Sequence, residues 1–206
     1  MKTSESVDNS AEQDTYADRI LDAARELFVR HGLRRTSLAQ IADQAGVAPA
    51  TLYRRFANRE ALLTALVIRE ADQVFVAVDA AVEEIDEPER ALVASFLVFV
   101  RALRDHDLLQ ELLTLDRELV LRMLTTEGGG FLAVGRDYLA RHLMRAQEQG
   151  ANLTAEPPVL AEIFIRFAHS LILTADTILP LDDEPKLSEL AQHTFARLAF
   201  APSASS

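Results

Sequence analysis

One short stretch of the sequence places aromatic and cationic side chains directly after a turn. Residues 46–56 read GVAPATLYRRF, so that a glycine and a proline precede Tyr53, Arg54 and Arg55. Guanidinium groups and tyrosine hydroxyls hydrogen-bond to phosphate oxygens, which fixes a protein on a nucleic acid without reading its bases. The stretch therefore indicates contact with a nucleic acid. The alternative is an ordinary helical hairpin with solvated arginines and a half-buried tyrosine.

The charge of the chain is unevenly distributed and supports the first interpretation for one part only. The whole chain has a formal net charge of −11. Residues 16–60 hold eight arginines against five acidic residues, a net charge of +3, whereas residues 61–206 carry a net charge of −11. Such asymmetry indicates a polyanionic partner for the basic part alone.

Glycine, proline and capping residues mark the helices around this stretch. Gly32 and Gly46 are suited to end helices, and Ser37 with Gln40 three residues later forms a capping box. Pro49 suits the first position of a helix, where its missing N–H needs no partner. The pattern predicts helices over residues 16–31, 38–45, 49–55 and 58–84.

Two short helices joined by a tight glycine turn, with a helix before them, form a helix-turn-helix unit. The second helix of such a pair enters the DNA major groove with its N-terminal residues at the base edges. Leu52 and Phe56 are predicted to face inward as core. The residues expected to approach bases are Ala48, Pro49, Ala50 and Thr51, and those expected to reach phosphates are Tyr53, Arg54 and Arg55.

Residues 16–67 resemble the tetracycline-repressor (TetR) family of bacterial regulators. The motifs that carry the resemblance are Thr36-Ser37, Ile41-Ala42, Ala45-Gly46-Val47, Leu52-Tyr53-Arg54-Arg55-Phe56 and Arg59-Glu60-Ala61-Leu62-Leu63. The resemblance implies that Thr36 or Ser37, together with Tyr53 and Arg59, contacts phosphates. Ala48 stands where the family usually has serine, so the recognition helix is expected to lack a side-chain N-cap. The resemblance also implies a repressor that binds a palindromic operator as a dimer and is released by an effector.

The acidic remainder is predicted to be helical throughout, with no stretch of strand periodicity. We therefore expect an all-α fold of about ten helices: an N-terminal helix-turn-helix domain followed by a larger ligand-binding and dimerisation domain. The expected divisions are a disordered arm over 1–15, the DNA-binding domain over 16–60, the helical domain over 61–200 and a disordered tail over 201–206.

Residues 158–179 carry too many apolar side chains for a single buried helix face. We expect this helix and the last one, residues 185–200, to form a four-helix bundle across a two-fold axis, because palindromic operators pair with two-fold proteins. The alternative is a fully internal helix in a monomer. The residues predicted at the interface are Phe164, Phe167, Leu171, Ala175, Leu190 and Thr194.

Two functions remain possible for the helical domain: an effector-controlled regulator, or an effector-free DNA-binding or helical interaction protein. A ligand cavity in the region of residues 88–180 would favour the first. An apolar lining favours a small apolar or aromatic effector. Each candidate for the lining could instead be an ordinary core residue. For His169 the alternative is an interior histidine whose hydrogen bonds are satisfied within the protein. These candidates are Phe96, Phe99, Leu103, Leu112, Met123, Phe131, Tyr138 and His169.

The sequence offers no catalytic centre, and we expect no metal or cofactor. The chain has no cysteine, and none of its five histidines has a second histidine four residues away or a glutamate three residues before it. The N-terminus has no apolar segment of the signal-peptide kind, and no apolar run approaches the roughly 20 residues that span a bilayer. We expect a cytoplasmic protein whose partners are duplex DNA, a small effector and a second copy of itself.

Overall fold

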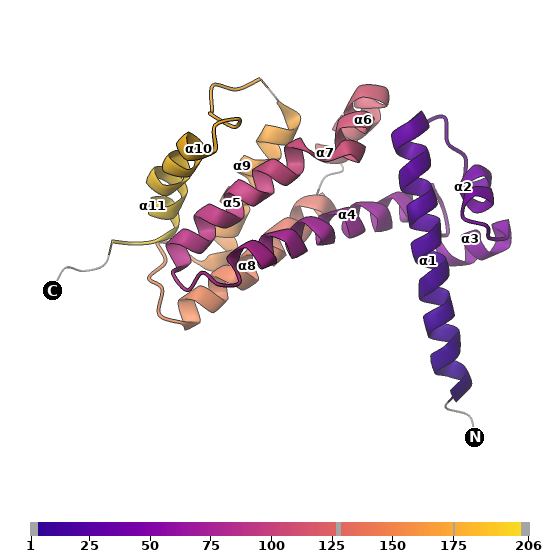
Figure 1. Cartoon of the computed structure of the whole chain (residues 1–206), viewed down its shortest axis with the longest axis horizontal. Coiled ribbons are helices and arrows are strands. Elements are labelled where there is room, and N and C mark those ends of the chain that lie inside the picture. The colour runs from indigo at the N-terminus through magenta and orange to yellow at the C-terminus, as the bar shows by residue number, and fades with distance from the viewer. Residues whose placement is uncertain (1–3, 127–128, 175, 203–206) are drawn as a thin grey trace. The chain divides into compact units, whose positions relative to one another are not determined.

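The computed structural model describes residues 4–126, 129–174 and 176–202, with side chains described from Thr15 onward except that of Phe131. The helices of the described residues are shown in Figure 1. Their backbone contacts divide the chain into two compact units. The first unit comprises residues 1–70 and 107–120, and the second comprises residues 71–106 and 121–206.

The all-α class and the count of about ten helices are confirmed. The described residues contain no strand, only an isolated bridge between Leu153 and Phe200. The helices of the first unit, with α4 continuing into the second, are α1 (Ser4–His31), α2 (Leu38–Gln44), α3 (Pro49–Arg55), α4 (Arg59–Val82) and α6 (Asp107–Leu115). The remaining elements are α5 (Pro88–Arg104), α7 (Arg117–Leu124), α8 (Gly129–Glu148), α9 (Pro157–Leu173), α10 (Glu184–Ala191), a π-helical turn η1 (Gln192–Ala196) and α11 (Arg197–Ala199).

The predicted helix ends of the first unit are formed by local hydrogen bonds. Ser37 and Gln40 make both hydrogen bonds of a capping box at the start of α2. Asn58 Oδ1 accepts from the backbone N–H of Ala61 at 2.8 Å and caps α4. Gly32 and Gly46 adopt positive φ angles of 79° and 62°, which glycine reaches at no steric cost.

Two limits in the structure differ from the predicted boundaries. Helix α1 begins at Ser4, so residues 4–15 extend a helix where a disordered arm was expected. The first unit also does not end at residue 60: it continues to Glu70 along α4 and takes in residues 107–120. Residues 1–3 of the expected arm and 203–206 of the expected tail lie outside the described residues.

The core of the first unit is made by α1, α2, α3, α4 and α6. Phe28 of α1 is fully buried, and Leu108 and Leu112 bring α6 against α1. The other large side chains of this core that are fully buried are Ile20, Leu33, Ile41, Leu52, Leu62 and Leu66.

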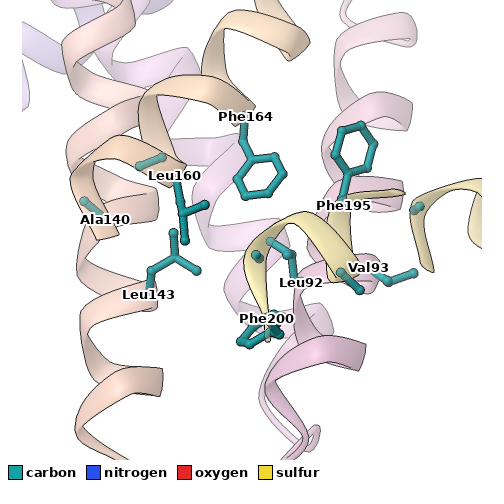
Figure 2. Packing of buried hydrophobic residues seen from close by; sticks show 12 residues of the cluster. Leu92, Val93, Ala140, Leu143, Leu160, Phe164, Phe195 and Phe200 are labelled. Carbon is teal, nitrogen blue, oxygen red and sulfur yellow. The ribbon is translucent and has the colours of Figure 1, made fainter. Parts of the chain in front are cut away.

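The second unit is organised around α8, α9, α5 and the C-terminal helices. Its buried cluster is shown in Figure 2, where Phe164 of α9 and Phe195 of η1 lie close together. Gly135 of α8 lets α9 approach closely, because a Cβ there would lie 3.0 Å from Ile165 Cδ1. Helix α9 ends at Leu173, six residues before its predicted end, and residue 175 lies outside the described residues.

Within the described residues, no helix combines the length and the apolar character needed to cross a membrane. The same residues contain no group of three or more potential ligands that could hold a metal ion.

Candidate nucleic-acid interface

Helix α3 has an outer face that matches the one predicted from the sequence. The Tyr53 side chain is 55% exposed, and Arg54 and Arg55 are exposed beside it. Leu52 and Phe56 face inward and are buried, as predicted. The helix therefore presents one aromatic and two cationic side chains to the outside while its other face holds it in the unit.

The N-terminus of α3 is built from small residues. Ala48 is the N-cap and makes no side-chain cap hydrogen bond, and Pro49 occupies the first turn. Ala48, Pro49 and Ala50 are exposed, and Thr51 is half-buried. A surface of this kind allows close approach to base edges, and the Thr51 side chain offers a methyl group and a hydroxyl for reading them.

Two arginines from neighbouring helices hold the backbone on either side of α2. Arg19 Nη2 of α1 donates to Ala45 O at 2.6 Å and to Gly46 O at 3.2 Å, at the turn between α2 and α3. Arg59 Nη1 of α4 donates to Thr36 O at 2.5 Å, just before α2. Burial lowers the pKa of the Arg59 guanidinium below its usual value, and the charge of Asp116 opposes that effect.

Two residues that the resemblance implied as phosphate contacts, Thr36 and Arg59, bond within the unit instead. Thr36 is 2% exposed, and its hydroxyl donates to Gly32 O at 2.9 Å, so this side chain lies inside the unit and not on its surface. The Arg59 side chain is partly buried against the Phe28 ring and is engaged at Thr36 O. Ser37 is exposed, but its hydroxyl is engaged in the capping box with Gln40.

Arg35, which the sequence did not single out, joins the outer surface next to α2. Its side chain is exposed, and neither it nor Arg54 makes an ion pair within the part of the chain that the structure describes. By contrast, Arg25, Arg30 and Arg34 each face a carboxylate. Arg35 differs from these arginines because no carboxylate of the described residues pairs with it. The linear sequence does not show which arginines have such a partner in three dimensions.

The helix-turn-helix segment matches a family model. Residues 20–66 match the model described as "Bacterial regulatory proteins, tetR family". The helix-turn-helix segment of this chain is thus similar to that of TetR-family regulators. The match covers α2, α3 and the beginning of α4 up to residue 66. It therefore includes the helix α3, whose outer face carries Tyr53, Arg54 and Arg55.

Relatives of this chain are helix-turn-helix regulators by name. It is 39% identical over 101 residues to the uncharacterized HTH-type transcriptional regulator Rv1255c of Mycobacterium tuberculosis, a match that covers 49% of this chain and 50% of that protein. The chain thus spans about half the length of this relative. Rv2250c, an uncharacterized regulator of the same organism, is 29% identical over 176 residues, covering 85% of this chain and 89% of the relative.

The solved structure of RolR in complex with the ligand resorcinol has the same fold. The TM-score is 0.66 at 18% identity, over 95% of this chain and 92% of that chain. At this identity the likeness establishes the fold alone, including the helical second unit beyond the matched family segment.

The second unit of the chain contains an apolar pocket with a volume of about 70 Å³. Of the predicted effector residues, Phe96, Phe99 and Tyr138 line it. The other lining residues are Phe75, Val78, Leu92, Ser95, Leu139, Phe164, Ile165, Phe167, Ala168 and Phe195. Sequence reasoning could not find them, because they come from α4, α5, α8, α9 and η1.

Four predicted effector residues lie elsewhere. Leu112 is buried in the first unit, on α6. Leu103 and Met123 are half-buried away from the pocket, and His169 Nε2 lies 2.6 Å from Leu124 O, as the interior alternative required. The side chain of Phe131 lies outside the described residues.

Tyr138 connects the pocket to a polar group on α4. Its ring stacks on Phe75 with centroids 4.1 Å apart, and its hydroxyl donates to Asp79 Oδ1 at 2.6 Å. Burial raises the pKa of Tyr138 well above its usual value, and the Asp79 hydrogen bond adds to the increase. The hydroxyl is therefore protonated and held by Asp79, so the pocket receives mainly the carbon atoms of the ring.

The predicted interface residues are distributed differently from expectation. Phe164 and Phe167 face inward and line the pocket, so these two side chains pack within the protomer's own core. Leu171 and Leu190 are half-buried, Thr194 is exposed with its hydroxyl on Leu190 O, and Ala175 lies outside the described residues. The large apolar side chains that are exposed on α8, α9 and α11 are Met144, Val159, Ile163 and Leu198.

Proposed function

We propose that this chain is a transcriptional repressor that binds a palindromic operator as a homodimer and is released by a small apolar effector. The observation that supports it best is the outer face of α3, which combines small N-terminal residues with exposed Tyr53, Arg54 and Arg55. Such a regulator is not an enzyme and acts in the cytoplasm, where bacterial DNA is found.

In this proposal the α3 residues divide into two roles. The residues from Ala48 to Thr51 approach base edges, with Thr51 contributing the side chain that discriminates among bases. Tyr53, Arg54 and Arg55 bind phosphates together with Arg35, and set the register and most of the salt-dependent affinity. Arg19 and Arg59 support these contacts indirectly, since they hold the backbone of the turns around α2.

The dimer follows from the operator symmetry and from apolar side chains that the protomer leaves uncovered. Val159 is 52% exposed and Ile163 is 44% exposed, and they lie four residues apart on one face of α9. A two-fold partner that covers this face would present two copies of α3 to successive major grooves, about 34–36 Å apart.

The effector class follows from the chemistry of the pocket lining. No lysine, arginine, aspartate or glutamate lines it, and a charged ligand would lose its hydration without gaining a partner. An apolar cavity of about 150 Å³ binds benzene, so the smaller pocket admits one aromatic ring only when its lining side chains move apart. RolR, with its bound resorcinol, is a protein of the same fold that takes a single-ring ligand.

Helix α4 is the element through which we propose that the effector acts on DNA binding. It supplies Leu62 and Leu66 to the core of the first unit, and Phe75 and Val78 to the pocket of the second. A coupling free energy of about 1–3 kcal/mol between the two sites changes operator affinity by about 5- to 150-fold.

The proposed operator recognition is tested by selecting binding sites from a random duplex pool with the full-length chain. The expected consensus is an inverted repeat with half-sites one helical turn apart, and Thr51→Ala should change the preferred half-site. Recovery of no consensus, with affinity equal for all duplexes, would contradict operator recognition.

The proposed binding of an apolar effector is tested by thermal shift of the full-length protein with two probes of similar size, toluene and benzoate. Toluene should raise the melting temperature and benzoate should not. Phe99→Trp, which fills the pocket, should abolish the toluene shift, while Ile178→Trp at a fully exposed position should retain it. No shift with toluene or other apolar compounds would favour the effector-free DNA-binding alternative.

A further inference from the structure

Asp116, between α6 and α7, is a buried carboxylate far in sequence from the DNA-binding face. Only 5% of the residue is exposed. Its Oδ2 accepts hydrogen bonds from the backbone N–H of Leu33 and, at 3.3 Å, from that of Arg34. Its Oδ1 lies 3.6 Å from Arg34 Nε. The carboxylate therefore holds two backbone donors of the turn between α1 and α2.

The turn itself is shaped to receive this carboxylate. Gly32 has a φ of 79°, and a Cβ at this position would lie only 2.6 Å from Asp116 Oδ2. At the other end of the turn, Arg59 Nη1 donates to Thr36 O, and the Thr36 hydroxyl donates to Gly32 O. Both ends of the turn are thus fixed by side chains, one of which comes from residues 107–120.

A buried carboxylate is stable only while its hydrogen-bond partners are in place. The converse also holds, since removing the carboxylate would leave the Leu33 and Arg34 amides without their acceptor. Exposed Arg35 follows these two residues directly. A change in the turn would therefore move a cationic side chain that belongs to the proposed DNA surface.

We propose that Asp116 is a positioning residue for DNA binding: its carboxylate fixes the turn that carries Arg35, and residues 107–120 are part of the DNA-binding unit. This inference rests on the proposed function. The chain leaves the first unit after Glu70, returns at Asp107 and leaves again after Val120, so the segment that supplies Asp116 continues into the second unit at both ends.

The decisive variant is Asp116→Ala in the full-length chain, which removes the charge and both acceptor oxygens, because charge alone and the proposed role predict opposite signs. Removing a negative charge near DNA should strengthen binding by reducing repulsion, whereas loss of the turn geometry should weaken it. Glu118→Gln removes a neighbouring carboxylate that is 91% exposed and pairs only loosely with Arg34, so it measures the charge effect by itself.

We expect Asp116→Ala to bind the duplex selected by the wild type at least tenfold more weakly, with a salt dependence shallower by about one unit if one phosphate contact is lost. Glu118→Gln should bind within twofold of the wild type or slightly tighter. Hydrogen exchange of the Leu33 and Arg34 amides should be slow in the wild type and in Glu118→Gln, and fast in Asp116→Ala.

A stability control separates positioning from general destabilisation. Ile20→Val, in the core of α1, should lower the melting temperature without changing the salt dependence of DNA binding. If Asp116→Ala does not fold, Gly32→Ala provides the second test, since it retains the carboxylate but forces a methyl group against it, and it should weaken binding to a similar extent.

Equal or tighter DNA binding by Asp116→Ala, or normal binding by Gly32→Ala, would overturn the inference. A wild-type chain that binds no duplex would overturn both the proposed function and this role of Asp116. Fast exchange of the Leu33 amide in a wild type that binds DNA would overturn only the role of Asp116.

Discussion

The two units of this chain use their polar and aromatic side chains in different ways. In the first unit, arginines and a buried carboxylate bind backbone groups at the ends of short helices, as Arg19, Arg59 and Asp116 do. In the second unit, aromatic rings contact one another around a pocket: the ring centroid of Phe195 lies 4.5 Å from that of Phe96 and 4.9 Å from that of Phe167.

Because of this difference, we expect substitutions in the two units to have different effects. Hydrogen bonds to turn backbone fix a surface in one geometry, which suits recognition of a DNA helix of fixed dimensions. Contacts among apolar rings lack direction and allow rearrangement around ligands. We therefore expect substitutions in the first unit to change DNA affinity, and substitutions in the second to change stability and ligand binding.

The largest effect is expected in the aromatic cluster. Phe195→Ala removes a ring that is 9% exposed and should lower the free energy of unfolding by about 3–5 kcal/mol, because a cavity replaces it. Ile178→Ala, at a fully exposed position, should change it by less than about 0.5 kcal/mol. Urea denaturation followed by circular dichroism measures both, and a loss below about 1 kcal/mol for Phe195→Ala would contradict the packing described.

A smaller effect is expected at the turn between α2 and α3. Gly46→Ala places a Cβ at a φ of 62° and 2.8 Å from Arg19 Nη2, so it should cost about 1–2 kcal/mol and weaken DNA binding. Gly130→Ala is the matched control, since a Cβ there meets nothing within 4 Å and φ is not positive. Equal stability and DNA affinity in the two variants would show that the turn does not need glycine.

The missing N-cap of α3 offers a gain of stability. Ala48→Ser supplies a hydroxyl where no side-chain cap exists and should raise the free energy of unfolding by about 1 kcal/mol. Ala50→Ser, inside the helix, should give no such gain. A thermal melt of the two variants checks this, and a lower melting temperature for Ala48→Ser would contradict the cap geometry.

The smallest effect is expected at His142, next to the pocket. Burial lowers its pKa, the charge of Asp79 opposes this, and the nearby Arg141 and Arg145 add to the decrease. The unfolded chain therefore takes up a proton more readily than the folded chain, so stability should fall as the pH drops through and below about 6.5. His142→Gln should lose a small part of this pH dependence, and an unchanged stability–pH curve would contradict the assignment.

The sequence predicted features that depend on neighbours within a few residues. Gly32, Gly46, the Ser37–Gln40 capping box and the first-turn Pro49 all occupy their expected positions. It also predicted the inward side of α3, because Leu52 and Phe56 lie four residues apart.

Features that depend on distant partners could not be predicted. Arg59 belongs to a motif that implied a phosphate contact. Its hydrogen-bond acceptor in the structure, Thr36 O, is 23 residues away in the sequence and could not be read from the motif. Asp116 is 83 residues from Leu33, and nothing local assigns residues 107–120 to the first unit. Phe164 and Phe167 lie on a helix that is apolar nearly all round, so periodicity alone could not say which side faces the protomer's own core.

The central claim is that the outer face of α3 binds DNA phosphates, and the salt dependence of duplex binding tests it most directly. Arg54→Ala should make the slope of log K against log salt concentration shallower by about one unit, because one phosphate contact is lost. Arg30→Ala is the matched control, since this exposed arginine of the same unit pairs with Glu26 at 2.6 Å and should leave the slope unchanged. Equal slopes for the wild type and both variants would contradict the claim.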